Sequence, residues 1–184
     1  HLRQADLEVR RIEGLGYSTL YMPDHFVDTE LAPMVGLSMA AAVTTDLRVS
    51  ALVFANDYKH PAVLAKEIAT LDVLSEGRVD LGIGAGWMQV DYDQLGMAYD
   101  RPGVRIDRLE EALAVIRGCW SGQPFSFAGE HYTITDHTPM RMTYAENFKR
   151  SAVAPVISAG VMTANIIWYA TNANGGITSA KSPV

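Results

Sequence analysis

The stretch from Leu47 to Trp87 constrains the fold of this 184-residue chain more than any other. An apolar run from Val49 to Ala55, interrupted only by Ser50, is typical of a strand that is covered on both faces. A helix is then expected to begin at His60-Pro61, because proline in a first turn sacrifices no hydrogen bond. The apolar stripe of this helix repeats at i, i+4 and i+7, at Leu64, Ile68 and Leu71.

A second strand is predicted over Arg78 to Ile83, after the helix stops at Gly77. The connection is long enough for a right-handed crossover, so the two strands should be parallel neighbours. The second strand runs into the small residues Gly82 to Gly86, where a backbone can approach a ligand closely. The sequence therefore predicts a βαβ unit with a binding loop at its carboxyl edge.

Helices are also predicted on both sides of this unit. They should cover residues 2–15, with Leu7, Ile12 and Leu15 inward, and residues 31–44. In the helix over 103–120 we expect one buried stripe and a charged solvent side that includes Arg105 and Arg108; the stripe is Leu109, Leu113, Ile116 and Trp120. Near the carboxyl terminus we expect a strand over 154–158, a helix over 163–172 and a strand over 176–179.

The alternation of β and α elements predicts a parallel sheet, either open and doubly wound or closed into a barrel. A strand over 18–22 supplies a further element. Residues 121–152 are expected to form an excursion, and the alternation around Gly129-Glu130 predicts either a β-hairpin or an extended segment within it. That excursion, together with polar residues after successive strands, favours the barrel. Because no linker divides the chain, residues 1–184 are expected to form a single domain.

The composition narrows the possible functions. A formal net charge of -6 argues against nucleic acid and against an anionic membrane surface as partners. No run approaches the roughly 20 apolar residues of a spanning helix, and the charged amino terminus is unlike a secretory signal, so a cytoplasmic location is expected. The single Cys119 excludes an internal disulfide, and we expect no metal site. Neither a GxSxG elbow nor a Walker loop is present, which argues against the simplest hydrolase and NTPase functions.

Four stretches carry a resemblance to a known family: GLGYSTLYMPDHF, TTDLRVSALVFANDYKHPAVLAKEIATLDVLSEGRVDLGIGAGW, RPGVRIDRLEEALAVIRGCWSG and FAGEHY. On these stretches, residues 1–136 resemble the bacterial luciferase-like monooxygenases, and within them the coenzyme F420-dependent oxidoreductases. The resemblance implies a TIM (β/α)8 barrel with a flavin or deazaflavin at the carboxyl ends of its strands. Barrels of this kind have roughly 250–300 residues, so this chain is expected to be a partial barrel with about strands 2 to 6.

Asp24 and His25 follow the strand over 18–22 and are the candidate catalytic residues. From the residues alone, the histidine is either a general acid or base or half of a structural pair that caps the next loop. The resemblance implies the first role, because F420-dependent dehydrogenases of the family have an Asp-His pair here at the cofactor. The luciferase itself has its catalytic histidine where Asp24 falls.

Three more groups are candidates for holding the cofactor. Leu52, Val53 and Phe54 match the strand bulge where the family carries a cis peptide behind the flavin ring. Asn56 and Asp57 follow, able to cap the next helix or to hydrogen-bond a cofactor. Gly84, Ala85 and Gly86 would let a ring lie against the backbone, with Trp87 as one wall. Some F420-dependent sugar-phosphate dehydrogenases have a glutamate proton donor at the Trp87 position, so that acid-base pairing is not expected here.

Ser158, Ala159 and Gly160 precede a predicted helix and are candidates for holding the cofactor phosphate. The function predicted from the resemblance is F420-dependent hydride transfer to or from a small organic substrate, with His25 as acid or base and Asp24 orienting it. One alternative is an FMNH2-dependent monooxygenase, which needs oxygen and a flavin reductase partner; another is a non-catalytic binding or structural protein. The resemblance also implies a homodimer, for which the small residues of 32–44 would suit close packing.

Overall fold

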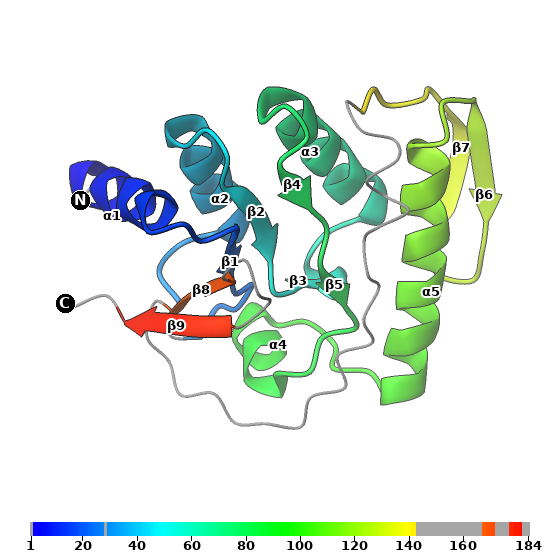
Figure 1. Ribbon diagram of the computed structural model, residues 1–184. Coiled ribbons are helices and arrows are strands. Elements are labelled where there is room, and N and C mark those ends of the chain that lie inside the picture. The colour runs from blue at the N-terminus through cyan, green and yellow to red at the C-terminus, as the bar shows by residue number, and fades with distance from the viewer. Residues whose placement is uncertain (1, 28, 143–166, 172–176, 182–184) are drawn as a thin grey trace. The chain divides into compact units, whose positions relative to one another are not determined.

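The computed structural model of the protein describes residues 2–27, 29–142, 167–171 and 177–181 (Figure 1). The chain divides into two compact units. Unit 1 comprises His1–Phe54, Arg78–Gly82 and Ser151–Val184, and unit 2 comprises Ala55–Gly77 and Ile83–Arg150. The predicted βαβ stretch therefore contributes its strands and its helix to different units.

Unit 1 is built around a sheet with the strand order β4-β2-β1-β8-β9. The strands are β1 (Thr19–Met22), β2 (Arg48–Ala51), β4 (Val79–Asp80), β8 (Ile167–Thr171) and β9 (Ile177–Lys181). β1 pairs with β2, and β2 with β4, in parallel, which confirms the crossover predicted from the sequence. β8 is antiparallel to β1, and β9 is antiparallel to β8, so the expectation of an entirely parallel sheet is wrong at this edge.

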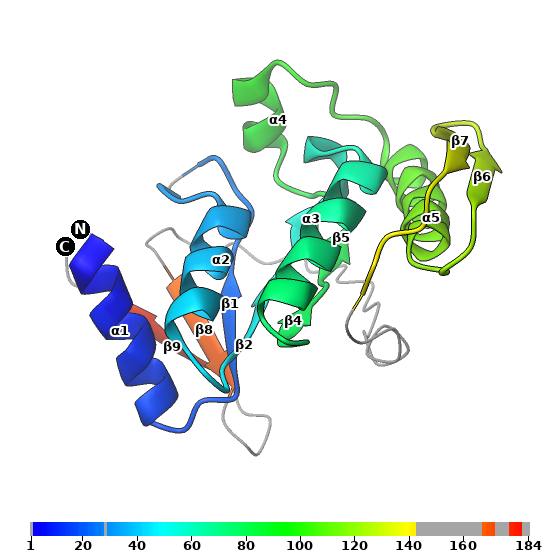
Figure 2. The ribbon, with the colours of Figure 1, turned by 90° about the horizontal axis from the view of Figure 1, so that it is seen from above.

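The helices of unit 1 are α1 (Leu2–Gly14) and α2 (Pro33–Val43). α2 packs on β1 and β2, and α1 lies beside α2 (Figure 2). The core between them is apolar and closed to solvent, since Leu20, Leu37 and Val49 have no exposed surface. Leu20 of β1 and Val49 of β2 are partners in the parallel register, and Leu37 of α2 belongs to the same core. The register brings the carboxyl ends of β1 and β2 side by side.

The face that α1 turns inward differs from the predicted one. Leu7 and Leu15 are 67% and 66% exposed, whereas Val9 is fully buried. The inward face contains Val9 and Glu13, one helical turn apart, because the Glu13 carboxylate accepts hydrogen bonds from the backbone N–H groups of residues 45–47. The face of α1 that turns toward the rest of unit 1 thus carries Val9 and the hydrogen-bonding carboxylate of Glu13, and not Leu7 or Leu15.

Unit 2 is mainly helical. It contains the 3-10 turn η1 (Asn56–Tyr58), α3 (Pro61–Leu74), β5 (Ile83–Gly84), α4 (Gln89–Leu95), α5 (Pro102–Cys119), β6 (Phe125–Ala128) and β7 (Thr133–His137); the chain enters it through β3 (Phe54–Ala55). α3 and α5 pack side by side, and the Trp120 indole N–H donates to the Ala65 carbonyl across 3.0 Å (Figures 1 and 2). β6 and β7 form the predicted hairpin.

Several predictions about unit 2 are confirmed. Leu64, Ile68 and Leu71 of α3 are buried, and His60 caps this helix by accepting from the Ala62 N–H at 3.2 Å. The cap is therefore His60, and the interpretation of Asn56 and Asp57 as helix caps is wrong. Among the described residues, no helix is both long and apolar enough to cross a membrane.

The buried stripe of α5 is shifted from the predicted one. Leu109 and Leu113 are only half-buried, whereas Ala112, Val115 and Cys119 are fully buried. The same rotation buries Arg105, which is 6% exposed and therefore does not lie on the solvent side. Arg105, Ala112 and Cys119 are spaced seven residues apart and share one face of the helix.

Of the elements predicted near the carboxyl terminus, the structure describes residues 167–171 and 177–181. The helix predicted over 163–172 is wrong where the structure describes it, because residues 167–171 form β8. The last strand is confirmed as β9, although it pairs antiparallel. The strand predicted over 154–158 lies outside the described residues.

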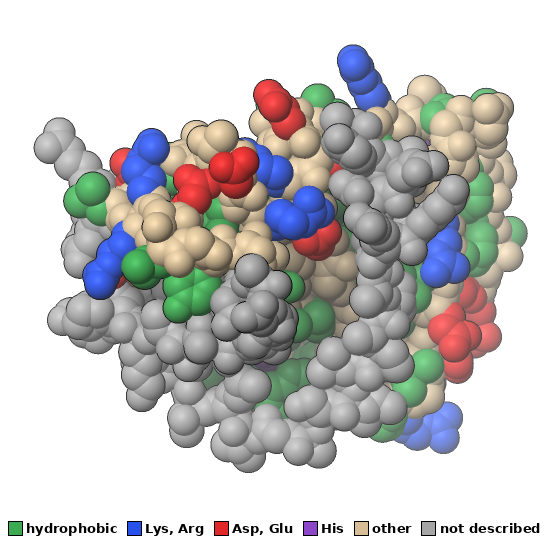
Figure 3. All heavy atoms as spheres, in the orientation of Figure 1, with side chains coloured by type: hydrophobic (Ala, Val, Ile, Leu, Met, Phe, Trp, Pro, Cys, Tyr) green, Lys and Arg blue, Asp and Glu red, His purple; other side chains and the backbone are tan. Residues whose placement is uncertain are grey.

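On the face drawn in Figure 3, acidic and basic side chains are interspersed.

Candidate functional site

The carboxyl ends of β1 and β2 bring the first candidates together. Met22 pairs with Ala51 at the end of both strands, and the Leu52 N–H donates to the Met22 carbonyl across 2.9 Å. Asp24 and His25 follow one strand, and Leu52 and Val53 follow the other. Because the strands are parallel, these two segments leave the sheet of unit 1 at the same edge.

Asp24 and His25 are both half-buried in the turn that follows β1. The Thr29 hydroxyl donates to the His25 carbonyl, which closes this turn on itself. A histidine at a strand end, neither sealed in the core nor fully in solvent, is accessible to a bound molecule and can act as a hydrogen-bond donor or acceptor toward it. The structure places Asp24 and His25 directly after β1, and their catalytic role stays a prediction.

The single strand predicted over 49–55 is interrupted. β2 ends at Ala51, the Leu52–Val53 peptide bond is cis as the resemblance implies, and β3 resumes at Phe54. Leu52 is 37% exposed and Phe54 is buried, so the segment presents one apolar side chain outward and anchors the other. The Phe54 N–H donates to the Gly82 carbonyl at 2.8 Å, which ties the segment to the end of β4.

Gly82 is the residue that allows this close approach. A Cβ atom at position 82 would lie 2.4 Å from the Ala51 carbonyl oxygen, a distance that no side chain tolerates. The first glycine of the predicted binding loop therefore packs one strand end against another. Its role within unit 1 is structural.

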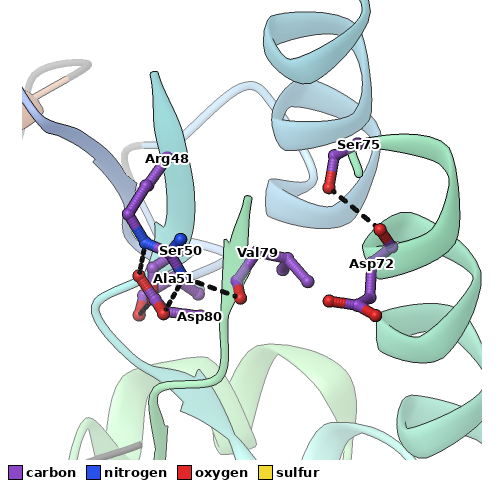
Figure 4. Close-up of polar contacts among 7 residues, drawn as sticks. All are labelled: Arg48, Ser50, Ala51, Asp72, Ser75, Val79 and Asp80. Carbon is purple, nitrogen blue, oxygen red and sulfur yellow. Dashed lines mark hydrogen bonds and ion pairs between the residues drawn. The ribbon is translucent and has the colours of Figure 1, made fainter. Parts of the chain in front are cut away.

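Below this edge, a charged pair joins β2 to β4. The Arg48 Nε donates to Asp80 Oδ2 at 2.8 Å, and the Arg48 guanidinium also reaches the Val79 carbonyl at 3.4 Å (Figure 4). Arg48 and Asp80 are each about one third exposed, so the pair contributes modestly to stability. The pair adds a side-chain link between two strands whose register sets Ser50 opposite Asp80.

In unit 2, Asn56 and Asp57 follow β3 and are deeply buried. Asn56 is 2% exposed; its Nδ2 donates to the Tyr132 hydroxyl at 3.2 Å, while its Oδ1 has no hydrogen-bond partner among the described residues. The Oδ1 of Asp57 is likewise buried and unpartnered among them. Leaving a buried acceptor unpaired is costly, so two such atoms in succession indicate a ligand or water that donates to them.

The other carboxylate oxygen of Asp57, Oδ2, has two partners. Asp57 Oδ2 forms an ion pair with Arg108 at 2.9 Å and accepts from the Tyr92 hydroxyl at 3.0 Å. Arg108 pairs with Asp100 as well. Burial alone would lower the pKa of Arg108, but the two carboxylates outweigh it and raise this pKa. Arg108 is thus a permanent cation, and Asp57 is held as its counter-ion.

Tyr92 connects this charged cluster to the loop of residues 84–87. Its side chain is fully buried, and burial followed by the neighbouring Asp57 charge raises the pKa of its hydroxyl. Gly86 has a φ of 77°, and a Cβ atom there would lie 2.0 Å from the Tyr92 hydroxyl oxygen. Only glycine satisfies both the backbone conformation and the contact. The Tyr99 hydroxyl donates to the Trp87 carbonyl at 2.8 Å and holds the end of the loop.

Two further residues hold segments around this cluster: Arg105 contacts Tyr99, and Glu111 binds the backbone next to Tyr132. The Arg105 guanidinium lies 4.1 Å from the centre of the Tyr99 ring, a cation–π contact, and it donates to the Asp100 carbonyl. The Glu111 carboxylate accepts from the backbone N–H groups of residues 130–132 at 2.7 to 3.1 Å, which positions Tyr132. Burial raises the pKa of the Tyr132 hydroxyl, so this group stays protonated.

The sequence reasoning missed Tyr92, Arg105, Arg108 and Tyr132. A signal was present for Arg105, which falls on the same seven-residue spacing as the buried Ala112 and Cys119. No comparable signal marks Arg108, whose partners lie 51 and 8 residues away along the chain. Trp87 is 44% exposed, so within unit 2 it stands open to solvent.

Some predicted site residues are not placed. Ser158, Ala159 and Gly160 lie outside the described residues, so the predicted phosphate contact stays a prediction. In the part of the chain that the structure describes, no three His, Cys, Asp or Glu side chains are grouped so that they could hold a metal ion.

Comparison with known proteins adds to this geometry. The sequence pattern of the family described as luciferase-like monooxygenase matches residues 1–184. An uncharacterised protein of Mycobacterium tuberculosis is 31% identical over 160 residues, which are 87% of this chain and 54% of that relative. The FMNH2-dependent dimethylsulfone monooxygenase of Pseudomonas fluorescens is 31% identical over 137 residues, which are 72% of this chain and 36% of that enzyme. The chain thus spans about half the length of such relatives, or less.

The solved structure of the coenzyme F420-dependent tetrahydromethanopterin reductase from Methanopyrus kandleri has a similar fold. It matches with a TM-score of 0.70 and 21% sequence identity, over 80% of this chain and 45% of that one. The fold described above is therefore the mixed α/β fold of these proteins, present over less than half of their length.

Proposed function

Because the chain belongs to the luciferase-like monooxygenase family, we propose that it takes part in flavin- or deazaflavin-dependent redox chemistry, specifically in coenzyme F420-dependent hydride transfer with a small organic substrate. The observation that carries the proposal is the position of Asp24 and His25, directly beyond the paired ends of β1 and β2. The chain spans only part of its relatives, so the proposal concerns the activity of the whole protein to which this chain contributes.

The residues of each unit fit such a group. In unit 1, the exposed Leu52 side chain and the backbone of Val53 and Phe54 offer an apolar support for a planar ring. In unit 2, the unpartnered Oδ1 atoms of Asn56 and Asp57 suit N–H or O–H donors of a ring or a ribityl chain. The small residues from Gly84 to Gly86 leave the backbone accessible, and Ser158 to Gly160 remain the proposed phosphate ligands.

The chain's own contribution is position and proton handling. His25 would act as the acid or base toward the bound molecule, and Asp24 would orient its imidazole. When bound, F420 supplies or accepts a hydride, whereas reduced FMN activates oxygen. The protein does not need to provide a stronger nucleophile or a metal for either reaction.

An FMNH2-dependent monooxygenase is the second candidate. It is favoured by the identity of 31% to the Pseudomonas fluorescens enzyme, over 72% of this chain. That function would require molecular oxygen and a flavin reductase as partner. F420-dependent transfer requires neither, so the cofactor preference separates the two candidates.

Binding of F420 and of FMN to the purified chain, followed by quenching of cofactor fluorescence, tests the proposal. We expect micromolar affinity for F420, weak binding of FMN, and a loss of F420 affinity in His25→Ala. His131→Ala is the matched control, because that histidine belongs to the hairpin turn. A preference for FMN would replace the proposal with the monooxygenase, and binding of neither would overturn the catalytic function for this chain in favour of a binding or structural role.

Two proposals about the assembly accompany this function. Residues 1–184 would be part of one barrel domain, and the whole protein would be a homodimer that packs through the small residues of α2. Sedimentation equilibrium of the chain, compared with an Ala42→Arg variant, tests the dimer. Ala42 is an exposed small residue of α2, so a large charged side chain there would disturb packing between copies without entering the core.

A further inference from the structure

A hollow of about 650 Å³ lies on unit 2, away from the residues discussed so far. Its walls are the outer face of α3 and the segment that follows β7; the lining residues are Lys66, Ala69, Thr70, Val73 and Leu74, and residues 137–141. Both walls are fixed. α3 is anchored by its buried stripe, and the Met140 N–H donates to the Cys119 carbonyl at the end of α5, at 3.0 Å. The volume is within the range of small-molecule sites.

The floor of the hollow is apolar. Ala69 is buried, while Val73 and Leu74 are 38% and 77% exposed within it, and Pro139 and Met140 line the opposite wall. Apolar surface of this kind gains free energy when a hydrocarbon group covers it. The floor therefore suits a short alkyl chain or another compact apolar body.

The rim of the hollow is cationic. Lys66 and Arg141 line it, and no Asp or Glu does. Neither cation has an ion-pair partner among the described residues, and the nearest carboxylate along α3, Glu67, is already paired with Lys59 at 2.5 Å. The chain as a whole is negative, with a formal net charge of -6, but the rim of this hollow is positive. Such an arrangement attracts a single anionic group.

His137 supplies a further polar group to the same hollow. Its Nδ1 atom is buried and has no hydrogen-bond partner among the described residues, although the ring lines the hollow. The Thr70 hydroxyl also lines the hollow, but it donates its proton to the Lys66 carbonyl at 2.8 Å and offers no donor to an anion. An oxyanion bound between Lys66 and Arg141 could accept hydrogen bonds from these two cations and from an N–H of the His137 ring, because such donors bind carboxylate and phosphate.

We propose that this hollow binds a small amphipathic anion, a carboxylate or phosphate group carried by a short apolar chain. The headgroup lies between Lys66 and Arg141, and the apolar chain covers Val73 and Leu74. The site shares no residue with the proposed cofactor site, so it can be tested whether or not the chain binds a flavin.

Titration of the chain with octanoate, followed by amide chemical shifts in two-dimensional NMR, tests the proposal. We expect the largest shifts at Ala69, Thr70 and Met140. 1-Octanol and inorganic phosphate should each bind about tenfold more weakly or worse, because each lacks one half of the interaction. Octyl phosphate should bind at least as well as octanoate, since it carries more charge.

Variants localise the binding. Lys66→Gln combined with Arg141→Gln should weaken octanoate binding about tenfold and leave 1-octanol unaffected. Thr70→Trp should abolish binding of both by filling the hollow, and it should not unfold the chain because Thr70 is exposed. Arg101→Gln is the matched control, an exposed arginine at the start of α5 outside the hollow.

Three results would overturn the proposal. One is equal binding of octanoate and 1-octanol, and another is octanoate affinity that survives the double substitution. The third is a concentration-dependent dimer that Leu74→Lys makes monomeric, with no octanoate shifts at the hollow; this face would then be a contact between copies.

Discussion

Glu13 and Glu111 perform the same task in the two units, and the comparison shows how differently the units hold their candidate residues. Each carboxylate accepts three successive backbone N–H groups from a distant segment, residues 45–47 for Glu13 and residues 130–132 for Glu111. The first segment leads into β2, which parallel pairing already holds on both sides. The second contains Tyr132, which contacts Asn56 through a side chain alone.

Backbone pairing therefore positions the candidates of unit 1, and side-chain charge positions those of unit 2. A strand ladder tolerates the loss of one side chain, because its hydrogen bonds belong to the backbone. A buried cluster such as Asp57, Tyr92 and Arg108 does not, because each removal leaves a desolvated partner. The candidates of unit 2 should accordingly be the more sensitive to single substitutions.

The largest effect is expected for Arg108→Met. It leaves the Asp57 carboxylate, which is 2% exposed, without its counter-ion, and should cost about 3–5 kcal/mol of unfolding free energy. Urea unfolding followed by tryptophan fluorescence in a Trp168→Phe background measures this, since Trp87 and Trp120 belong to unit 2 and Trp168 belongs to unit 1. Adding Asp57→Asn should recover part of the loss. Arg117→Met, an exposed arginine on the same helix, is the control, and an equal loss there would contradict the comparison.

A smaller loss, of about 1.5–3 kcal/mol, is expected for Tyr92→Phe, which removes one charge-assisted hydrogen bond to Asp57 and keeps the ring. The same unfolding experiment measures it. Amide exchange of the loop over residues 84–87 should also accelerate, because the Tyr92 hydroxyl abuts Gly86. Unchanged exchange there would show that the loop does not depend on the cluster.

In unit 1 the candidate residues depend on close backbone packing, so the substitution expected to disturb them is Gly82→Ala. The new Cβ atom would lie 2.4 Å from the Ala51 carbonyl oxygen and force the strand ends apart, at about 1–3 kcal/mol. Amide exchange of β2 and β4 measures the effect. Gly14→Ala is the matched control, because nothing lies within 4 Å of a Cβ atom at that position. Equal effects of the two substitutions would refute the close contact.

The smallest effects should come from Glu13→Gln and Glu111→Gln, and they depend on pH. Burial acts to raise the pKa of each carboxylate, but three backbone N–H donors outweigh it and lower the pKa below the ordinary value of 4.5. A group with a lowered folded-state pKa stabilises the protein above its unfolded pKa and loses that contribution as the pH falls through the folded one.

The difference between wild type and each variant should therefore be complete at pH 7 and shrink below about pH 4.5. Thermal unfolding at several pH values measures it. The two variants should differ in ligand binding. Glu111→Gln should also weaken the contact between Asn56 and Tyr132 and so reduce F420 binding, whereas Glu13→Gln should not. A reduction in F420 binding with Glu13→Gln alone would contradict the comparison between the units.

Much of the scaffold was predictable because it follows local periodicity. The stripe of Leu64, Ile68 and Leu71, the glycines after the strands and the spacing of the crossover predicted α3 and the parallel pairing of β2 with β4. The same reasoning located Asp24 and His25 beyond β1. It failed for α1 and α5, where the buried face is set by Glu13 and by Arg105 and not by leucines.

From the first helix to the hairpin of β6 and β7, the sequence by itself determined the order of strands and helices and the residues that follow each strand, because those depend on neighbours a few positions away. Only the tertiary structure decided that Arg105 and Asp57 are buried, that Tyr92 meets Gly86, and that β8 pairs antiparallel with β1. A charged residue is buried where other groups compensate its charge, by an opposite charge for Asp57 and by a carbonyl and an aromatic ring for Arg105. The opposite charge for Asp57, on Arg108, comes from a segment far away in the chain, and no local pattern records it.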